Sequence, residues 1–127
     1  MNPHCPCGRA TALADCCGPY LSGAPAPDAE RLMRSRYTAY VLEDEAYLLT
    51  TWHPDTRPEA LNLKADRPAK WLGLTVKLCR QLDEDHATVE FVARYKIAGR
   101  AFRMHEISRF EKIAGRWYYL AGDPTGS

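Results

Sequence analysis

The sequence predicts one α+β domain in which two helices cover one face of a curved antiparallel sheet, preceded by a short segment rich in cysteine. The hydrophobic pattern changes from a period of about 3.6 to a period of about 2 near Trp71, so strands follow helices along the chain. Four strand-like runs come one after another, joined by short turns. Four of the five cysteines lie within the first seventeen residues, outside both patterns.

Length and composition indicate an ordinary globular domain. The chain has 127 residues, of which 46% are hydrophobic and 26% charged, enough to bury a core without cross-links. Its 17 Lys and Arg against 16 Asp and Glu give a net charge of +1, so nucleic acid is not a favoured partner. There is no apolar run of the roughly 20 residues that span a bilayer, and no secretion signal. We therefore expect a cytoplasmic protein with reduced thiols and no membrane association.

The cysteine cluster is the main chemical signal. Cys5 and Cys7 are separated by one residue, and eight residues intervene before the adjacent Cys16 and Cys17, so one short loop can gather four sulfurs around one ion. Thiolates suit Zn²⁺, which binds four ligands tetrahedrally. Four protein ligands leave no open position, so the zinc would be structural and would order a segment too short to have a core. The alternatives are disulfides or redox-active thiols, unliganded cysteines, and another soft metal such as iron.

The segment that holds these cysteines, residues 1–22, is called the knuckle below. Pro6 stiffens the first cysteine pair, and Gly8 can take a positive φ that turns backbone amides toward the sulfurs. His4 neighbours the cluster, but four thiolates already complete the site. Cys79 lies alone in a strand-like run, and we expect it to be a small packing residue.

A stretch of small residues and proline, LSGAPAPDAE, indicates a linker, so we place the main domain at residues 28–127. Asp28 is expected to cap a helix that begins at Ala29. Spacing assigns the two faces of this helix, with Met33, Tyr37, Tyr40 and Val41 on the apolar face and Arg31, Arg34 and Thr38 opposite. Asp44 is expected to cap a second, shorter helix that ends before Pro54.

Beyond the second helix, residues 55–70 look irregular, and the four strands follow. Alternation predicts which strand residues face the core: Leu72, Leu74, Val76 and Leu78 in the first run, Val89, Phe91, Ala93, Tyr95 and Ile97 in the second, and Phe102, Met104 and Phe110 in the third. The fourth run, RWYYLAG, follows a turn at Ala114 and Gly115.

Two sets of motifs resemble known families. CPCG, a short spacer, CC and GPY resemble the SEC-C zinc motif, best known from the tail of the protein-translocation motor SecA. Over nearly the whole chain, LMRSRYTAYV, TWHP, WLGL, HEISRFE and GRWYYL are similar to the YchJ-type family of small bacterial proteins. That resemblance implies a cystatin-like, nuclear-transport-factor-two-like cone behind an N-terminal SEC-C knuckle. Many such proteins carry another SEC-C motif at the C-terminus, which this chain lacks, and the family implies no established reaction.

Cones of this kind often hold a pocket between the helices and the concave face of the sheet. Glu106 and Ser108 share the predicted core face of the third strand, and Arg36 projects from the apolar stripe of the first helix. A buried carboxylate needs a partner, so we expect Arg36 and Glu106 to approach each other. The pair could fix helix against sheet, or it could bind a ligand. Further candidates for the pocket lining are Tyr40, Trp52, His53 and Trp71.

The leading hypothesis is a noncatalytic zinc-binding adaptor whose knuckle docks on a protein partner. In that hypothesis the cone either forms a homodimer through its sheet or binds a small-molecule ligand. The alternative is a small enzyme of the isomerase, dehydratase or hydrolase type that uses Glu106 with Arg36. The sequence shows no nucleophile with an obvious base, no phosphate-binding glycine loop and no open metal triad. Nucleic-acid binding through the knuckle is a third, weaker hypothesis.

Overall fold

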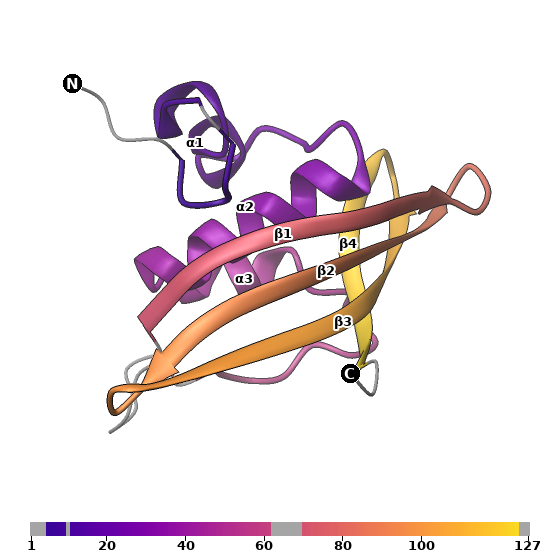
Figure 1. The fold of residues 1–127 in the computed structure, drawn as a ribbon. Helices are drawn as coiled ribbons and strands as arrows, with labels where there is room; N and C mark the ends of the chain where they lie inside the picture. Colours follow the sequence, from indigo (N-terminus) through magenta and orange to yellow (C-terminus); the bar gives the residue numbers. More distant parts are fainter. Residues whose placement is uncertain (1–4, 10, 62–69, 125–127) are drawn as a thin grey trace.

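A four-stranded antiparallel sheet curves around one long helix in the computed structural model of this chain (Figure 1). The structure describes residues 5–9, 11–61 and 70–124. Its elements are η1 (Leu13–Asp15), α1 (Gly18–Leu21), α2 (Ala29–Leu42), α3 (Glu45–Thr50), β1 (Lys70–Gln81), β2 (His86–Ile97), β3 (Arg100–Ile113) and β4 (Arg116–Pro124). The predicted α+β class, with helices on one side of a curved sheet, is confirmed. The short η1 and α1 inside the knuckle were not predicted.

Both helix starts expected from the sequence have the predicted side-chain caps. The Asp28 carboxylate accepts the backbone N–H of Arg31 at 2.7 Å, and the Asp44 carboxylate accepts that of Tyr47 at 3.1 Å. Each cap satisfies one of the N–H groups that a helix start leaves without a partner. α2 ends where Glu43 takes the left-handed conformation, with φ of 58°. Of the region expected to be irregular, residues 55–61 form no helix or strand, and residues 62–69 lie outside the described residues.

The sheet has the order β1-β2-β3-β4, with every neighbouring pair antiparallel. Two-residue turns connect β2 to β3 and β3 to β4, and both residues of each turn have positive φ. That geometry matches the right-handed twist of the paired strands. The turns are Ala98-Gly99 and Ala114-Gly115. Among the described residues, none of the helices has the length and apolar character needed to cross a membrane.

Two register shifts in β1 make part of the predicted alternation wrong. Pairing places Trp71 opposite Tyr95, and after the second shift it places Cys79 opposite Val89. The bulges take Leu72 and Leu78 off the inward face, because each adds one residue to a strand whose side chains alternate. Trp71 lies on the inward face, whereas β1 is exposed from Lys77 to Gln81. Leu72 and Leu78 are consequently exposed.

Phe102 also departs from its expected burial. It lies on the same strand face as Phe110, but near the β2–β3 turn it stacks on Tyr95, with ring centroids 5.5 Å apart. Arg100 lies over its other side, 5.6 Å from the ring centroid. Phe102 is 39% exposed, whereas Phe110 is 1% exposed and belongs to the core. The apolar face of β3 therefore continues beyond the part of the sheet that is buried.

The polar face of α2, expected to point away from the core, is the face on which the knuckle lies. Figure 1 shows the knuckle against α2 and next to β1. Thr38 is completely buried, and its hydroxyl oxygen lies 3.6 Å from the Cys5 sulfur. Arg34 donates from Nη1 to the Cys7 carbonyl oxygen at 2.9 Å. The core is accordingly continuous from the knuckle through α2 to the sheet.

Residues that follow α3 cover the outer edge of β4. Trp52 forms a parallel bridge with Tyr119. The Tyr119 carbonyl accepts the N–H of His53 at 2.7 Å, and the Tyr119 N–H donates to the Thr51 carbonyl at 2.8 Å. These bonds tie the end of α3 to the sheet.

Two phenylalanines on the same face of β3 provide a test of this core. We expect Phe110→Ala to lower the free energy of unfolding by about 3–5 kcal/mol, because it leaves a cavity in the core. Phe102→Ala should cost about 1 kcal/mol, the value of its ring contacts at a partly exposed site. Urea denaturation followed by circular dichroism measures both. Equal losses would contradict the placement of Phe102 outside the core.

Candidate metal centre and cavity

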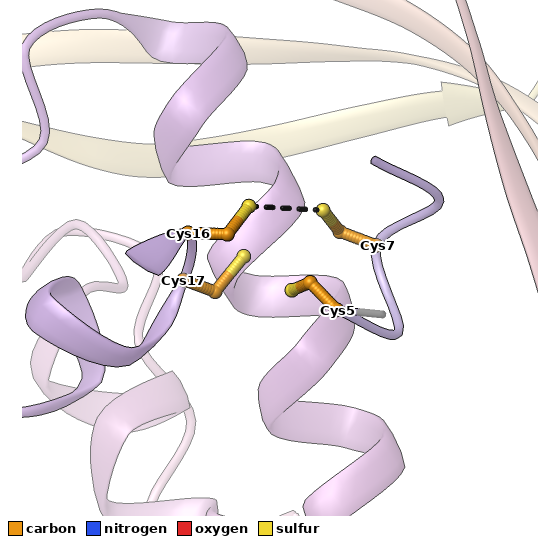
Figure 2. Close-up of side chains that lie close together, drawn as sticks. All are labelled: Cys5, Cys7, Cys16 and Cys17. Carbon is orange, nitrogen blue, oxygen red and sulfur yellow. Dashed lines mark hydrogen bonds between the residues drawn. The ribbon is translucent and has the colours of Figure 1, made fainter. Parts of the chain in front are cut away.

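The four knuckle cysteines converge on one point, as Figure 2 shows. Their sulfur atoms all lie within 4.8 Å of one another, and the Cys7 and Cys16 sulfurs are 3.7 Å apart. A bonded disulfide would place two sulfurs about 2.05 Å apart, and all five cysteines of the chain are free thiols. Cys5, Cys7 and Cys17 are buried, and Cys16 is partly exposed.

This arrangement fits a tetrahedrally bound metal ion. A metal–sulfur bond of about 2.3 Å in a tetrahedron separates neighbouring sulfurs by about 3.8 Å. The separation of the Cys7 and Cys16 sulfurs, 3.7 Å, matches that value. Thiolates are ligands for zinc and for other soft cations such as iron. The cluster can therefore hold one such ion using only groups of this chain.

The backbone around Cys5 and Cys7 has the turn that such a site needs. The Gly8 N–H donates to the Cys5 carbonyl at 3.2 Å, and the Cys5 N–H donates to the Thr11 carbonyl at 2.7 Å. Gly8 has φ of +95°, and a Cβ there would lie 3.0 Å from the Leu74 carbonyl oxygen of β1. Glycine is thus required twice, by the left-handed conformation and by the close approach of the loop to the sheet.

The mutual hydrogen bonding of the thiols favours a negative charge on one sulfur. A hydrogen bond from Cys17, with smaller contributions from the Arg9 N–H and the Cys5 and Cys16 thiols, lowers the pKa of Cys7 to about 5. Burial and the neighbouring Cys7 raise the pKa of Cys16 to about 11. The same thiolate, together with burial, raises the pKa of Cys17. The raised pKa of Cys16 and of Cys17 means that a nearby cation would favour their ionisation.

A second candidate site is a cavity of about 240 Å³ between α2 and the concave face of the sheet. α2 contributes Arg36 and Tyr40, β1 contributes Trp71, and β3 contributes Glu106 and Ser108. Five of the seven residues proposed from the sequence thus line one space.

Arg36 and Glu106 share the cavity but do not form the expected ion pair. Nη1 of Arg36 donates to the Leu48 carbonyl at 2.8 Å and to the Thr51 hydroxyl at 2.6 Å. The guanidinium also stacks on two rings, 4.6 Å from the centroid of Tyr119 and 5.1 Å from that of Trp52. Within the residues that the structure describes, no carboxylate lies within 4.0 Å of it. The C-terminal end of α3 and two aromatic rings thus take the place that the sequence suggested for Glu106.

The Glu106 carboxylate lies in a space created by a glycine. Ser108 donates its hydroxyl to Oε2 of Glu106 at 3.0 Å. Gly122 on β4 pairs with Ser108, and a Cβ at position 122 would overlap the Glu106 carboxyl group. The absence of a side chain at Gly122 therefore makes room for the carboxylate on the inner face of the sheet.

The two remaining candidates lie outside the cavity lining. Trp52 packs edge-on against Tyr119, with ring centroids 4.9 Å apart, and its ring centroid lies 5.1 Å from the Arg36 guanidinium. His53 is buried, and its Nε2 lies 3.1 Å from a Glu111 carboxylate oxygen. Both residues belong to the segment that joins α3 to the edge of β4.

Two other sequence predictions concern Cys79 and His4. Cys79 is exposed, so its predicted role as a packing residue is wrong. Its thiol donates to the Glu30 carboxylate at 3.5 Å; partial desolvation of the sulfur, followed by the charge of this carboxylate, raises the pKa of Cys79 to about 11. His4 lies outside the described residues.

Sequence reasoning missed Tyr119 as part of the cavity lining and Gly122 as the residue that makes room for Glu106. Burial, and then the Glu106 carboxylate, raise the pKa of Tyr119 to about 12, so its phenol remains a hydrogen-bond donor at neutral pH. The alternation of RWYYLAG could have placed Tyr119 on the inner face. Nothing in the sequence pairs Gly122 with a residue on another strand.

Comparisons with known proteins agree with this architecture. A family model described as YchJ, middle NTF2-like domain, matches residues 28–122. UPF0225 proteins of Bordetella pertussis and Polaromonas naphthalenivorans are 59% and 53% identical to this chain, covering 94% and 97% of it and 91% and 98% of their own lengths.

Two solved structures are similar along nearly the whole chain. One is the solution structure of a SEC-C motif containing protein from Rhodopseudomonas palustris, with a TM-score of 0.87 and 36% identity over 98% of this chain and 99% of that one. The other is the crystal structure of a sec-c motif containing protein from Psychrobacter arcticus, with a TM-score of 0.78 and 33% identity. It covers 97% of this chain, which spans 83% of that protein.

The contact between Gly122 and Glu106 yields a prediction. Gly122→Ala should displace the carboxylate and lower the free energy of unfolding by about 1–3 kcal/mol. In a Glu106→Ala background the same change should cost less than about 0.5 kcal/mol, since the group it meets is gone. A double-mutant cycle by urea denaturation measures the difference. An undiminished cost in that background would show that Gly122 is needed for another reason.

Proposed function

Because the chain belongs to the UPF0225 family of YchJ-type proteins, with their NTF2-like domain, we propose that it is a noncatalytic adaptor whose knuckle is held in shape by one zinc ion. The observation that carries this proposal is the convergence of four free thiols within 4.8 Å. The SEC-C motif named for both similar structures supports it.

The zinc in this proposal is structural. All four ligands come from the chain, so no position remains for a substrate or an activated water molecule. Cys5, Cys7 and Cys17 are also part of the core that α2 and β1 complete. An ion at this point would join the two cysteine pairs to each other and hold both against α2. Its chemical contribution is to neutralise thiolates that cannot otherwise share so small a volume.

The surface proposed for partner binding is the outer side of the knuckle. Its inner side is fixed by the contacts of Arg34 and Thr38, whereas Asp15 and Pro19 are exposed and Arg9 is partly exposed. This outer surface carries both signs of charge and a proline, which suits a protein partner better than a polyanion. A zinc-dependent site needs reduced thiols, so we place the protein in the cytoplasm.

Metal analysis tests the zinc proposal. We expect one zinc ion per chain in wild-type protein and in Cys79→Ser, the matched control outside the cluster. Cys7→Ser and Cys17→Ser should lose most of the zinc and lower Tm by about 10 °C or more, since the site belongs to the continuous core. Elemental analysis and thermal denaturation measure these effects. Zinc-free wild-type protein of unchanged stability, or another stoichiometric metal such as iron, would refute the assignment.

Site-specific crosslinking tests the adaptor proposal. A photoreactive phenylalanine analogue at Pro19, on the outer side of the knuckle, should give one discrete protein adduct in growing bacteria. The same analogue at Glu84, in the exposed β1–β2 turn, serves as the control and should not give that adduct. Adding Cys17→Ser should abolish the adduct, since the knuckle loses its shape without metal. An adduct that survives Cys17→Ser, or the absence of any discrete adduct at Pro19, would exclude a zinc-dependent docking surface.

A further inference from the structure

The cavity between α2 and the sheet combines two opposite charges with apolar walls. Its volume of about 240 Å³ lies just below the range of about 300–1,000 Å³ that is typical of small-molecule sites, so an occupant would be small. The lining includes one cation and one anion within the described part of the chain, Arg36 and Glu106. The cavity and the cysteine cluster lie on different faces of α2, and the inference below does not depend on zinc.

Arg36 is held as a buried cation in a fixed orientation. It is only 3% exposed, and burial lowers its pKa to about 10, so it is still charged at neutral pH. Both hydrogen bonds that it makes within the described residues start from Nη1, and Arg36 lines the cavity. The remaining N–H groups of a guanidinium form a rigid set of donors for a carbonyl or carboxylate oxygen.

Glu106 provides the complementary acceptor. Oε2 of its carboxylate is fixed by the Ser108 hydroxyl, and Gly122 leaves the space in which the group lies. The phenols of Tyr40 and Tyr119 lie within electrostatic reach of both Arg36 and Glu106. The two charges therefore line the same cavity without neutralising each other by direct contact.

Other walls of the cavity are apolar and partly aromatic. They are formed by Trp71, Phe91, Met33 and Met104. Trp71 is fixed by Tyr37 and Tyr95, with ring centroids 5.6 and 5.4 Å away. A flat apolar group could pack between these side chains, and methionine adapts to the shape of such a group.

Charge balance decides what kind of molecule fits. A ligand with a net charge would lose its hydration and then meet one attractive and one repulsive group. A neutral molecule with an oxygen acceptor beside an N–H donor can satisfy Arg36 and Glu106 together. We infer that the cavity binds a small, net-neutral, dipolar molecule with an aromatic or otherwise flat apolar body, of the carboxamide type.

Three probes with the same ring separate the possibilities: benzamide is neutral and dipolar, benzoate is an anion, and benzylammonium is a cation. A ligand of about nine non-hydrogen atoms should bind with roughly millimolar affinity. Titration of ¹⁵N-labelled full-length protein, followed by amide chemical shifts, should place benzamide between α2 and β3. We expect the two charged probes to bind about tenfold more weakly.

Glu106→Gln provides the decisive variant, because it removes the negative charge and keeps the size and a hydrogen-bond acceptor for Ser108. Among the described residues Arg36 is then the only charge in the cavity lining, so benzoate should gain about tenfold and bind more tightly than benzamide. Asp85→Asn is the matched control, an equivalent change at an exposed position in the β1–β2 turn, and should leave the order of the probes unchanged. Ala93→Leu, which fills the cavity, should abolish shifts from all three.

Several results would overturn the inference. These are benzoate or benzylammonium binding to wild-type protein as tightly as benzamide, an unchanged order in Glu106→Gln, or benzamide shifts that survive Ala93→Leu. Wild-type protein that binds none of the probes at millimolar concentration would also overturn it. Zinc content, measured on every sample, keeps these outcomes distinct from the fate of the metal centre: a zinc-loaded protein with an unresponsive cavity refutes only the cavity inference.

Discussion

The rest of the structure depends on one constraint, which is that helix α2 is surrounded on nearly every side while carrying a polar sequence. Ser35, Arg36 and Thr38 are all buried, so each needs a partner inside the protein. Ser35 bonds the Leu32 carbonyl and the Tyr47 hydroxyl, Arg36 bonds the end of α3, and Thr38 meets the Cys5 sulfur. These three polar residues, close together in sequence, contact different neighbours of α2 around the helix axis. The knuckle, α3 and the sheet are positioned together because one helix supplies a contact to each.

The two candidate sites lie on different faces of that helix and have opposite chemical character. The cysteine cluster is closed, since every ligand position can be filled by a sulfur of the chain itself. The cavity is incomplete, since among the described residues Arg36 donates only from Nη1 and the Glu106 carboxylate accepts only the Ser108 hydroxyl. A closed site favours a structural role, and an incomplete one favours recognition. α2 also connects them, because Arg34 contacts the knuckle two residues before Arg36 reaches the cavity.

Much of the fold follows from local patterns, and the departures follow from contacts that no local pattern encodes. The caps at Asp28 and Asp44 and the two hairpin turns depend on neighbouring residues, so the sequence predicts them. The bulges in β1 depend on pairing with β2 and therefore reverse the faces of Leu72 and Leu78 without a signal of their own. The same limit applies to Arg36, whose burial follows from its spacing, but whose partner is a backbone carbonyl and has no sequence signature. Thr38 looked solvated because the knuckle that covers it is distant in sequence.

The segment from Thr51 to His53 has a consequence for how the protein behaves at high concentration. An open sheet has two outer strands, and their unpaired backbone groups can recruit strands from other molecules, which leads to aggregation. On β4 the N–H and carbonyl of Tyr119 are already bonded to the protein's own chain. Trp52 adds bulk beside them through its edge-on contact with the Tyr119 ring. A strand from another molecule therefore cannot pair with β4 at Tyr119. Thr51 and Trp52, which also contact Arg36, thus protect this edge of the sheet from intermolecular strand pairing.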